Sequence, residues 1–598
     1  MSCFRILNST QPRFPRLVVT TLLAVASAFV LGLAGLGPVA PALAEEPVDW
    51  EMVTRIRDEG LHHSQVMETL RHLTEEIGPR LTGSPQMKQA NEWTRDQMTE
   101  WGLANAHLEP FDFGRGWSFT RASLHLVEPI GMPLIALPEA WTPGTDGPVR
   151  GELMRVEIES KDDFDKYRGK LAGKVLLVDD ARELMDSEGE PPTRRLDDED
   201  LHELVQLEMP GGGPDPARRR RFRRRIEMRQ ALHDFLTEEG VVAVLEISSR
   251  DGGLVRVGGG GSRWPDENPG PPVLVVAAEH YNKLVRMVEA RAPKEKPRNE
   301  GDEAAADEEA HRDDGDQNEE GNDEGNGEGN EEPAAEPTEP VVVEVDVRAR
   351  FHDDDPNAYN TVAELPGTDL ADEVVLVGAH LDSWHGGTGA TDDGGPCAAV
   401  MESLRILHTL GVQPRRTIRM VLWSGEEQGL LGSRAYVAEH YASRPEPEDP
   451  KQKRLPSFLR DKTGPLTVKP DHERVAAYFN LDNGVGKIRG IYSQENAGVV
   501  PIFEAWLRPF HDLGATTVTQ NDTRGTDHLS FHAVGLPGFQ FIQDPMDYFS
   551  RTHHTNMDTI DHVHEDDLKQ ASVVLASFLY HAAMRDAKLP RPPMPRDD

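Results

Sequence analysis

Cysteine is scarce in this sequence. Of 598 residues only Cys3 and Cys397 are cysteines, and Cys3 lies in an N-terminal stretch that we expect to be removed. The mature chain is therefore predicted to have no internal disulfide, whatever its compartment. A chain of this length exceeds one ordinary domain, so we expect at least two.

Positive charge is also in deficit. The sequence has 64 Lys and Arg against 103 Asp and Glu, a formal net charge of −39, which argues against nucleic acid as a partner. One basic run, Arg218–Arg225, is of a kind that binds nucleic acid or anionic lipid. We favour a solvated helix face instead, because Asp197–Asp200 and Glu203 could neutralise the run and aromatic residues are few.

The one long apolar run is at the N-terminus. Three arginines precede a stretch from Leu17 to Leu36, and a small-residue cleavage signal follows at Ala42–Ala44. This pattern predicts a secretory signal peptide over residues 1–44. The alternative is a retained membrane anchor, since the apolar stretch approaches the length of a bilayer span. In either case we expect the body of the protein outside the cytoplasm, secreted or periplasmic, with a membrane as partner only if the segment is retained.

The rest of the chain divides by composition. Residues 45–132 have a helical pattern and form the first part of the main predicted domain. Residues 133–346 contain short strand-like runs and are predicted to be a separate β-rich domain. Within them, residues 293–340 are acidic and have almost no apolar side chain beyond alanine, so we expect this tract to be disordered. Residues 347–590 return to α/β alternation and form the larger part of the main domain.

Apolar runs in this last region stop at polar residues. The run Val374–Val377 stops before His380, and Ile418–Trp423 stops before Glu426. Short runs separated by a helical pattern are typical of buried parallel strands. Catalytic groups in such sheets lie beyond the carboxyl ends of the strands. The sequence therefore gathers acids and a histidine where a metal-dependent enzyme needs them.

His380 and Asp382 are two residues apart on an expected extended segment, where both side chains point to the same side. The Asp382 carboxylate could then accept the second ring N–H of a metal-bound His380 and fix its tautomer. The alternative is a buried histidine beside a surface acid.

Two acidic pairs extend this set. Asp392 and Asp393 lie in a glycine-rich loop that can bend sharply, so one of them could bridge two metals; alone, the pair reads as a flexible acidic turn. Glu426 and Glu427 repel each other unless cations offset their charges. One can bind a metal while the other takes a proton from water and donates it to a leaving amine. The alternative is a solvated pair at a helix start.

Asp482, after a third strand, and His554, in a later loop, complete the candidates, although each alone is an ordinary residue. With His380, Asp392 and Glu427 they offer N and O ligands that suit zinc, with cobalt or manganese as alternatives. Such a set is enough for two metals about 3.5–4 Å apart, which lower the pKa of water and polarise a carbonyl. That chemistry is hydrolysis of an amide or ester.

Longer motifs surround these residues. They are Ile77–Ser84, Gly378–Trp384, Gly389–Gly395, Leu422–Gly429, Gly525–Asp527 and His553–Thr559. Together they resemble the co-catalytic di-zinc exopeptidases, and within them the carboxypeptidase Q (plasma glutamate carboxypeptidase) branch. The resemblance implies an α/β fold with a mixed, largely parallel sheet flanked by helices. It also implies that residues 133–346 are a protease-associated domain inserted into the peptidase domain.

The resemblance further implies a role for each residue. Glu426 matches the general acid/base, and Asp382 matches the acid that orients the zinc-bound histidine. The implied ligands are His380 and Asp482 for one zinc, Glu427 and His554 for the other, and Asp392 between them.

Two positions depart from the pattern of that branch. His385 replaces the acid that follows Ser-Trp, and Arg524 stands where the branch has an acid before Gly525. Together with His553 they are our candidate substrate-binding residues. Arg524 is also a candidate cation for a substrate carboxylate.

The sequence therefore predicts a secreted enzyme with two zinc ions that hydrolyses dipeptides or short peptides. Release of C-terminal or of N-terminal residues stays open, and dimer contacts made by such inserted domains in relatives allow a homodimer. The rival hypothesis is a non-catalytic, receptor-like binding protein of the same fold. That hypothesis predicts a missing ligand or base, whereas the full set is present here.

Overall fold

The computed structural model describes residues 46–184, 193–206, 216–291, 339–456, 459–461 and 463–595. The expected signal peptide 1–44 and the acidic tract up to residue 338 lie outside the described residues. Within the described residues, no helix is both long and apolar enough to cross a membrane.

The first of two large sheets is mixed, as the sequence predicts. Its strand order is β1-β10-β12-β11-β15-β18-β16-β17, and the central β12, β11, β15 and β18 run parallel. β10 and β16 pair with this parallel group in the antiparallel direction. The bounds are β1 Ala104–Asp112, β10 Asn357–Leu365, β11 Leu370–His380, β12 Arg416–Trp423, β15 Val475–Asn480, β16 Ile488–Tyr492, β17 Thr517–Thr519 and β18 Gly538–Gln543.

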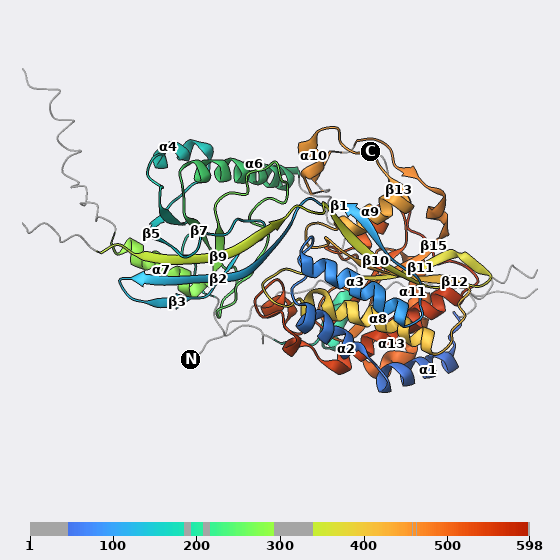
Figure 1. Cartoon of the computed structure of the whole chain (residues 1–598). Coiled ribbons are helices and arrows are strands. Elements are labelled where there is room, and N and C mark those ends of the chain that lie inside the picture. Colours follow the sequence, from blue (N-terminus) through green and yellow to red (C-terminus); the bar gives the residue numbers. More distant parts are fainter. Residues whose placement is uncertain are drawn as a thin grey trace, which may run out of the picture. The chain divides into compact units, whose positions relative to one another are not determined.

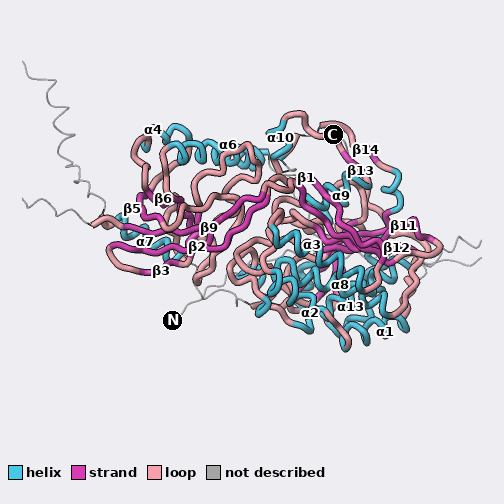
Figure 2. The backbone as a smooth tube through the Cα atoms, viewed as in Figure 1, coloured by secondary structure: helices cyan, strands magenta, loops and turns pink. Residues whose placement is uncertain are grey.

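Helices cover both faces of this sheet (Figures 1 and 2). Val375 and Val377 on β11 pack into a core with α1 (Trp50–His62), α8 (Gly395–Thr409) and α13 (Glu565–Met584). The alternate residues of β11 pack into a second core with α9 (Leu431–His440) and α12 (His528–His532). Because successive side chains of a strand point to opposite faces, burial on both sides explains why these strands are continuous apolar runs.

The second sheet has the order β3-β2-β9-β5-β6-β7-β8-β4. The helices α6 (Pro216–Glu238) and α7 (Ala278–Glu289) accompany it. Its bounds are β2 Gly116–Glu128, β3 Met132–Leu134, β4 Ala136–Pro138, β5 Val149–Arg155, β6 Lys174–Leu177, β7 Ala243–Ile247, β8 Val273–Val276 and β9 Val342–His352.

The strands of the second sheet begin earlier and end later than the predicted range 133–346. β2 pairs antiparallel with β9 from Gly116↔His352 to Glu128↔Val342. In the first sheet, β1 pairs with β10 just before and just after these strands. The two sheets are thus joined by a continuous two-stranded ribbon. Because the chain stays extended along this ribbon, the sequence shows no change of secondary structure that marks the domain boundary. The identification of this region as a protease-associated domain stays a prediction.

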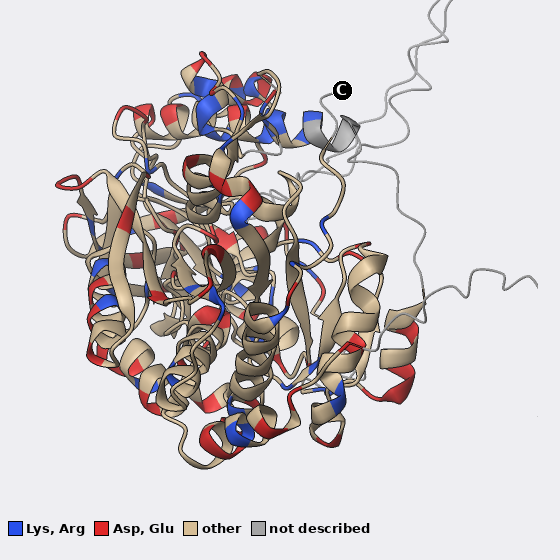
Figure 3. Cartoon of the chain, turned by 90° about the vertical axis from the view of Figure 1, so that its right-hand side faces the viewer, with Lys and Arg blue, Asp and Glu red and all other residues tan. Residues whose placement is uncertain are grey.

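The basic run lies on α6, and one of its arginines has a described partner outside the expected acids. Arg223 pairs with Asp461 at 2.7 Å. Asp197 instead caps the helix α5 (Asp198–Val205), and Asp200 pairs with Arg194. Acidic and basic residues are interspersed over the cartoon of the chain in Figure 3.

Candidate active site

The candidate residues meet at the carboxyl ends of the parallel strands. β11 ends at His380, which lies opposite Trp423, the last residue of β12. On the other side of β11, Gly378 lies opposite Asn480, the last residue of β15. This register brings the turns that carry Glu427 and Asp482 to the same edge of the sheet as His380.

His380 and Asp482, here called the strand-end pair, lie together beside Asp392. His380 Nε2 is 3.2 Å from Asp392 Oδ1 and 3.7 Å from Asp482 Oδ1. All three side chains are buried. Ligand atoms of these three residues lie within 4.8 Å of one another.

Glu427 and His554, the loop-end pair, lie at the other oxygen of Asp392. His554 Nε2 is 3.2 Å from Asp392 Oδ2 and 3.0 Å from Glu427 Oε2. Burial opposes protonation of His554, but Glu427 and Asp392 outweigh it and raise the pKa of His554 to about 10. Asp392 thus presents one carboxylate oxygen to each pair, which is the arrangement of a bridging ligand.

The donor set fits two metal ions. Glu427 Oε1 is buried without a hydrogen-bond partner. Buried carboxylates without partners are costly unless a cation compensates them. Imidazole nitrogens and carboxylate oxygens are the donors that zinc takes in catalytic sites. The described residues therefore offer the donors, the burial and the uncompensated negative charge that such ions require.

Asp382 contacts the His380 ring through its backbone carbonyl as well as its carboxylate, and the carbonyl is nearer. His380 Nδ1 lies 2.9 Å from the backbone carbonyl oxygen of Asp382 and 3.6 Å from its carboxylate. The carboxylate also accepts from Thr82 Oγ1 at 2.8 Å and from the backbone N–H of Glu426 at 3.3 Å. The reason is that β11 ends at His380, so Asp382 is no longer in strand register. The Asp382 carbonyl thus orients the His380 ring, and the Asp382 carboxylate stabilises the turn that carries Glu426.

Two supporting residues were not assigned roles from the sequence. The buried Arg80 donates to the carbonyl oxygens of Leu381 and Gly389, both at 2.7 Å. The Asp558 carboxylate accepts from the backbone N–H of Thr391 at 2.6 Å. Both brace the loop that carries Asp392. Their motifs, Ile77–Ser84 and His553–Thr559, were the available signal.

Glu426 follows β12 and is half-buried at the same edge of the sheet. Burial raises its pKa well above the ordinary range, and the charges of Asp482 and Asp527 add to the effect. Asp527 is itself fully buried, and neither of its carboxylate oxygens has a hydrogen-bond partner. Burial raises the pKa of Asp527 to about 7. A proton-accepting group and a second uncompensated acid thus adjoin the ligands.

The three candidate substrate-binding residues lie in different surroundings. The His553 ring packs against that of His554 in a tilted arrangement with centroids 3.8 Å apart, and its Nε2 is 3.9 Å from Asp392 Oδ2. The His385 ring is buried against Trp117, and its Nε2 donates to the carbonyl of Pro138 at 2.7 Å. Arg524 is 71% exposed and pairs with Asp522. Of the three, the described contacts bring only His553 to the ligands.

One further residue at the site was missed. Arg256, from the segment between β7 and β8, places Nη2 2.9 Å from His554 Nδ1. No sequence motif marked it.

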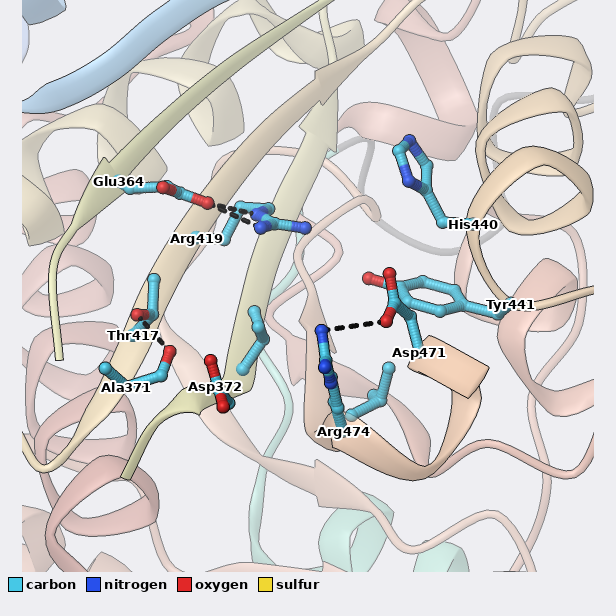
Figure 4. Close-up of a pocket in the computed structure, with 11 residues that line it drawn as sticks. Glu364, Ala371, Asp372, Thr417, Arg419, His440, Tyr441, Asp471 and Arg474 are labelled. Atoms are coloured by element: carbon cyan, nitrogen blue, oxygen red, sulfur yellow. Dashed lines mark hydrogen bonds and ion pairs between the residues drawn. The ribbon is translucent and has the colours of Figure 1, made fainter. Parts of the chain in front are cut away.

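A cavity of about 200 Å³ lies elsewhere in the described part of the chain (Figure 4). Its lining includes Val374, Thr417 and Val475, at or near the amino ends of the strands that carry the site at their other ends. Its arginines are already paired, Arg419 with Glu364 at 2.6 Å and Arg474 with Asp471 at 2.9 Å. No proposed ligand lines this cavity.

The chain is similar to known peptidases. Residues 360–579 match peptidase family M28. The chain is 24% identical to carboxypeptidase Q of Mus musculus over 89% of this chain and 88% of that protein. It is 32% identical to carboxypeptidase Q of Bos taurus over 42% of this chain and 47% of that protein.

The fold has a solved counterpart. A peptidase M28 precursor from Shewanella amazonensis SB2B superposes with a TM-score of 0.58 at 22% identity, covering 92% of this chain and 99% of that one. The family match over residues 360–579 and the relatives support a zinc exopeptidase of the peptidase M28 kind, similar to the carboxypeptidase Q branch, and the solved structure shows the same fold.

Proposed function

We propose that the chain hydrolyses peptide bonds of dipeptides or short peptides with two zinc ions at this site. The observation that carries the proposal is Asp392, whose Oδ1 faces His380 and whose Oδ2 faces His554, each at 3.2 Å. The strand-end pair would hold one ion and the loop-end pair would hold the other. Asp392 would contribute one oxygen to each ion. Bound there, the ions would polarise the scissile carbonyl and lower the pKa of water.

The chain's own residues supply the remaining steps. Glu426 adjoins the ligands without being needed as one, so it is the group that takes a proton from water and donates it to the leaving amine. The Asp382 carboxylate positions Glu426 by accepting its backbone N–H at 3.3 Å. Asp382 is thus a positioning residue. We also propose that the enzyme acts outside the cytoplasm, on the basis of residues 1–44.

The direction of cleavage has two candidates. The name carboxypeptidase Q, carried by the relatives above, supports action at a free C-terminus. Aminopeptidase action requires an acid for the substrate amine, and the buried Asp527, without a hydrogen-bond partner, is the observation that favours it. A dipeptide presents both termini, so the two candidates are separated only by blocked substrates.

The test combines metal analysis with hydrolysis. Purified protein is assayed for zinc, and then for hydrolysis of free, N-blocked and C-blocked dipeptides, with and without a chelator. We expect about two zinc ions per chain, from the two-metal arrangement, and activity that the chelator abolishes. Protein that binds no metal tightly and stays inactive with added zinc would overturn the proposal in favour of a receptor-like protein.

A further inference from the structure

The segment between β7 and β8 of the second sheet reaches the metal site. Val257 N–H donates to the carbonyl of His554 at 3.0 Å, and Asn556 N–H donates to the carbonyl of Val255 at 3.2 Å. Arg256 forms an antiparallel bridge with Thr555. These backbone contacts fix Arg256 beside the loop-end pair, independently of its side chain.

The guanidinium of Arg256 has one described partner. Its Nη2 lies 2.9 Å from His554 Nδ1. Among the described residues, no carboxylate lies within the 4.0 Å ion-pair distance of Arg256. Arg524, by contrast, is paired with Asp522 at 3.2 Å. Arg256 is partly exposed, so a ligand from solvent can approach it.

The contact with His554 is not compatible with a metal-bound ring. Nε2 of His554 faces Asp392 and Glu427 and is the atom placed to bind a metal. When the Nε2 of a neutral imidazole binds a metal, Nδ1 carries the ring proton and is a donor. Arginine has donors only, so its Nη2 then needs another acceptor. The loaded site therefore leaves a guanidinium with unsatisfied donors next to the ligands.

A second cation lies near Arg256. Burial lowers the pKa of Arg250, and the charge of Arg256 lowers it further. Arg250 Nε is buried and has no hydrogen-bond partner. Two neighbouring guanidinium groups, neither satisfied by a described carboxylate, favour an anionic ligand at this end of the site.

We propose that Arg256 binds the C-terminal carboxylate of the peptide substrate and so selects peptides with a free C-terminus. The inference rests on the proposed function, because it assigns a substrate group at that same site. Guanidinium and carboxylate match in a two-bond geometry that lysine does not reproduce. The proposal thus assigns to Arg256, in the segment between β7 and β8, the carboxylate-binding role for which Arg524 was a candidate.

The experiment compares a dipeptide with its C-terminal amide. The wild-type enzyme is expected to prefer the free dipeptide in kcat/KM. In Arg256→Gln that preference is expected to fall by about 10–100-fold, the range for loss of a charge-assisted contact, with unchanged zinc content. Arg256→Lys, which keeps the charge, is expected to restore part of it. Arg150→Gln, which removes an exposed arginine of β5 paired with Glu344, is the matched control and is expected to keep the wild-type ratio.

A binding measurement gives a readout without turnover. In a Glu426→Gln background, calorimetry measures the Kd of the same dipeptide and of its amide. Adding Arg256→Gln is expected to weaken the dipeptide about 10–100-fold and to bring the two Kd values together. Thermal unfolding of each variant establishes that it is folded. If Arg256→Gln does not fold, Arg256→Lys replaces it in the binding measurement.

The outcomes separate the two proposals. A zinc-loaded wild type that hydrolyses neither substrate refutes the proposed function. If the wild type hydrolyses both equally, or if Arg256→Gln keeps the preference, the function stands and the role of Arg256 is wrong. Equal losses on both substrates with reduced zinc content would mean that Arg256 only positions His554, which also overturns the inference.

Discussion

The strand-end pair and the loop-end pair bind the same Asp392 but are built differently. His380 ends β11 and Asp482 follows the neighbouring parallel strand β15, and both are buried. His554 comes from a loop, has a left-handed backbone (φ 63°) and keeps a 17% exposed side chain. Its carbonyl and its ring also contact a segment of the second sheet. The strand end is therefore determined by one sheet, whereas the loop end depends on contacts between two.

The largest effect expected is that of metal removal, which affects both ends. Dialysis against a chelator should reduce hydrolysis to the buffer background, and zinc should restore it, because polarisation of the carbonyl and activation of water both depend on the ions. Zinc content and activity are followed together. Because the strand end is more deeply buried, its ion should leave last. Simultaneous loss of both ions would contradict the distinction between the two ends.

Glu426→Gln should have the next largest effect. Loss of a general base costs about 10²–10⁴ in kcat, whereas both pairs of ligands remain. Steady-state kinetics and zinc analysis of the same preparation test this. Near-normal turnover would show that the base is wrongly assigned. A loss of zinc would place Glu426 among the ligands of one end.

Asp382→Asn tests the connection between the ends. Its carboxylate accepts from Thr82 Oγ1 and from the backbone of Glu426, while its carbonyl faces His380. Changes to such supporting groups typically weaken metal affinity about 10–100-fold. Competition with a chelator measures that affinity. Asp471→Asn, in the cavity at the far ends of the strands, is the control and should behave as wild type.

Much of the strand end could be predicted from the sequence. Apolar runs that stop at acids indicate parallel strands, and parallel strands place their following residues at one edge. What the sequence did not reveal is which atom of Asp382 lies nearest to His380 Nδ1. Because β11 ends at His380, two residues before Asp382, that atom is the carbonyl oxygen rather than a carboxylate oxygen.

In the loop end, Glu427 could be predicted because it follows an apolar run, whereas the pairing of Glu427 with His554 was implied only by the family motifs. His554 and Arg256 are 298 residues apart, and no local pattern links them. For the same reason the surroundings of the two positions that depart from the family could not be predicted, and their role in substrate binding stays a prediction. His385 is enclosed by aromatic rings and held by Pro138, and Arg524 faces solvent. Side-chain direction at such positions depends on tertiary contacts that a single sequence does not reveal.

The smallest effect expected concerns the support of the loop end. Glu139 accepts from the N–H of Gly258 at 2.9 Å, next to the segment that contacts His554. Burial raises the pKa of Glu139 from 4.5 to about 8, with a contribution from Glu246. Between these pH values the folded state binds a proton that the unfolded state has released. The free energy of unfolding should therefore fall as pH rises through this window and level off above it.

Glu139→Gln should remove that part of the pH dependence while leaving kcat at neutral pH close to wild type, because the amide still accepts from Gly258. Urea unfolding of both proteins from pH 5 to about 9 measures the slopes, since the expected window ends near the shifted pKa. Glu344→Gln, at a partly exposed acid of β9, controls for the loss of a surface charge. An unchanged slope in Glu139→Gln would mean that Glu139 is ionised in the folded protein. The loop end would then be supported by a buried charge, and its dependence on the second sheet would be electrostatic rather than a matter of backbone pairing.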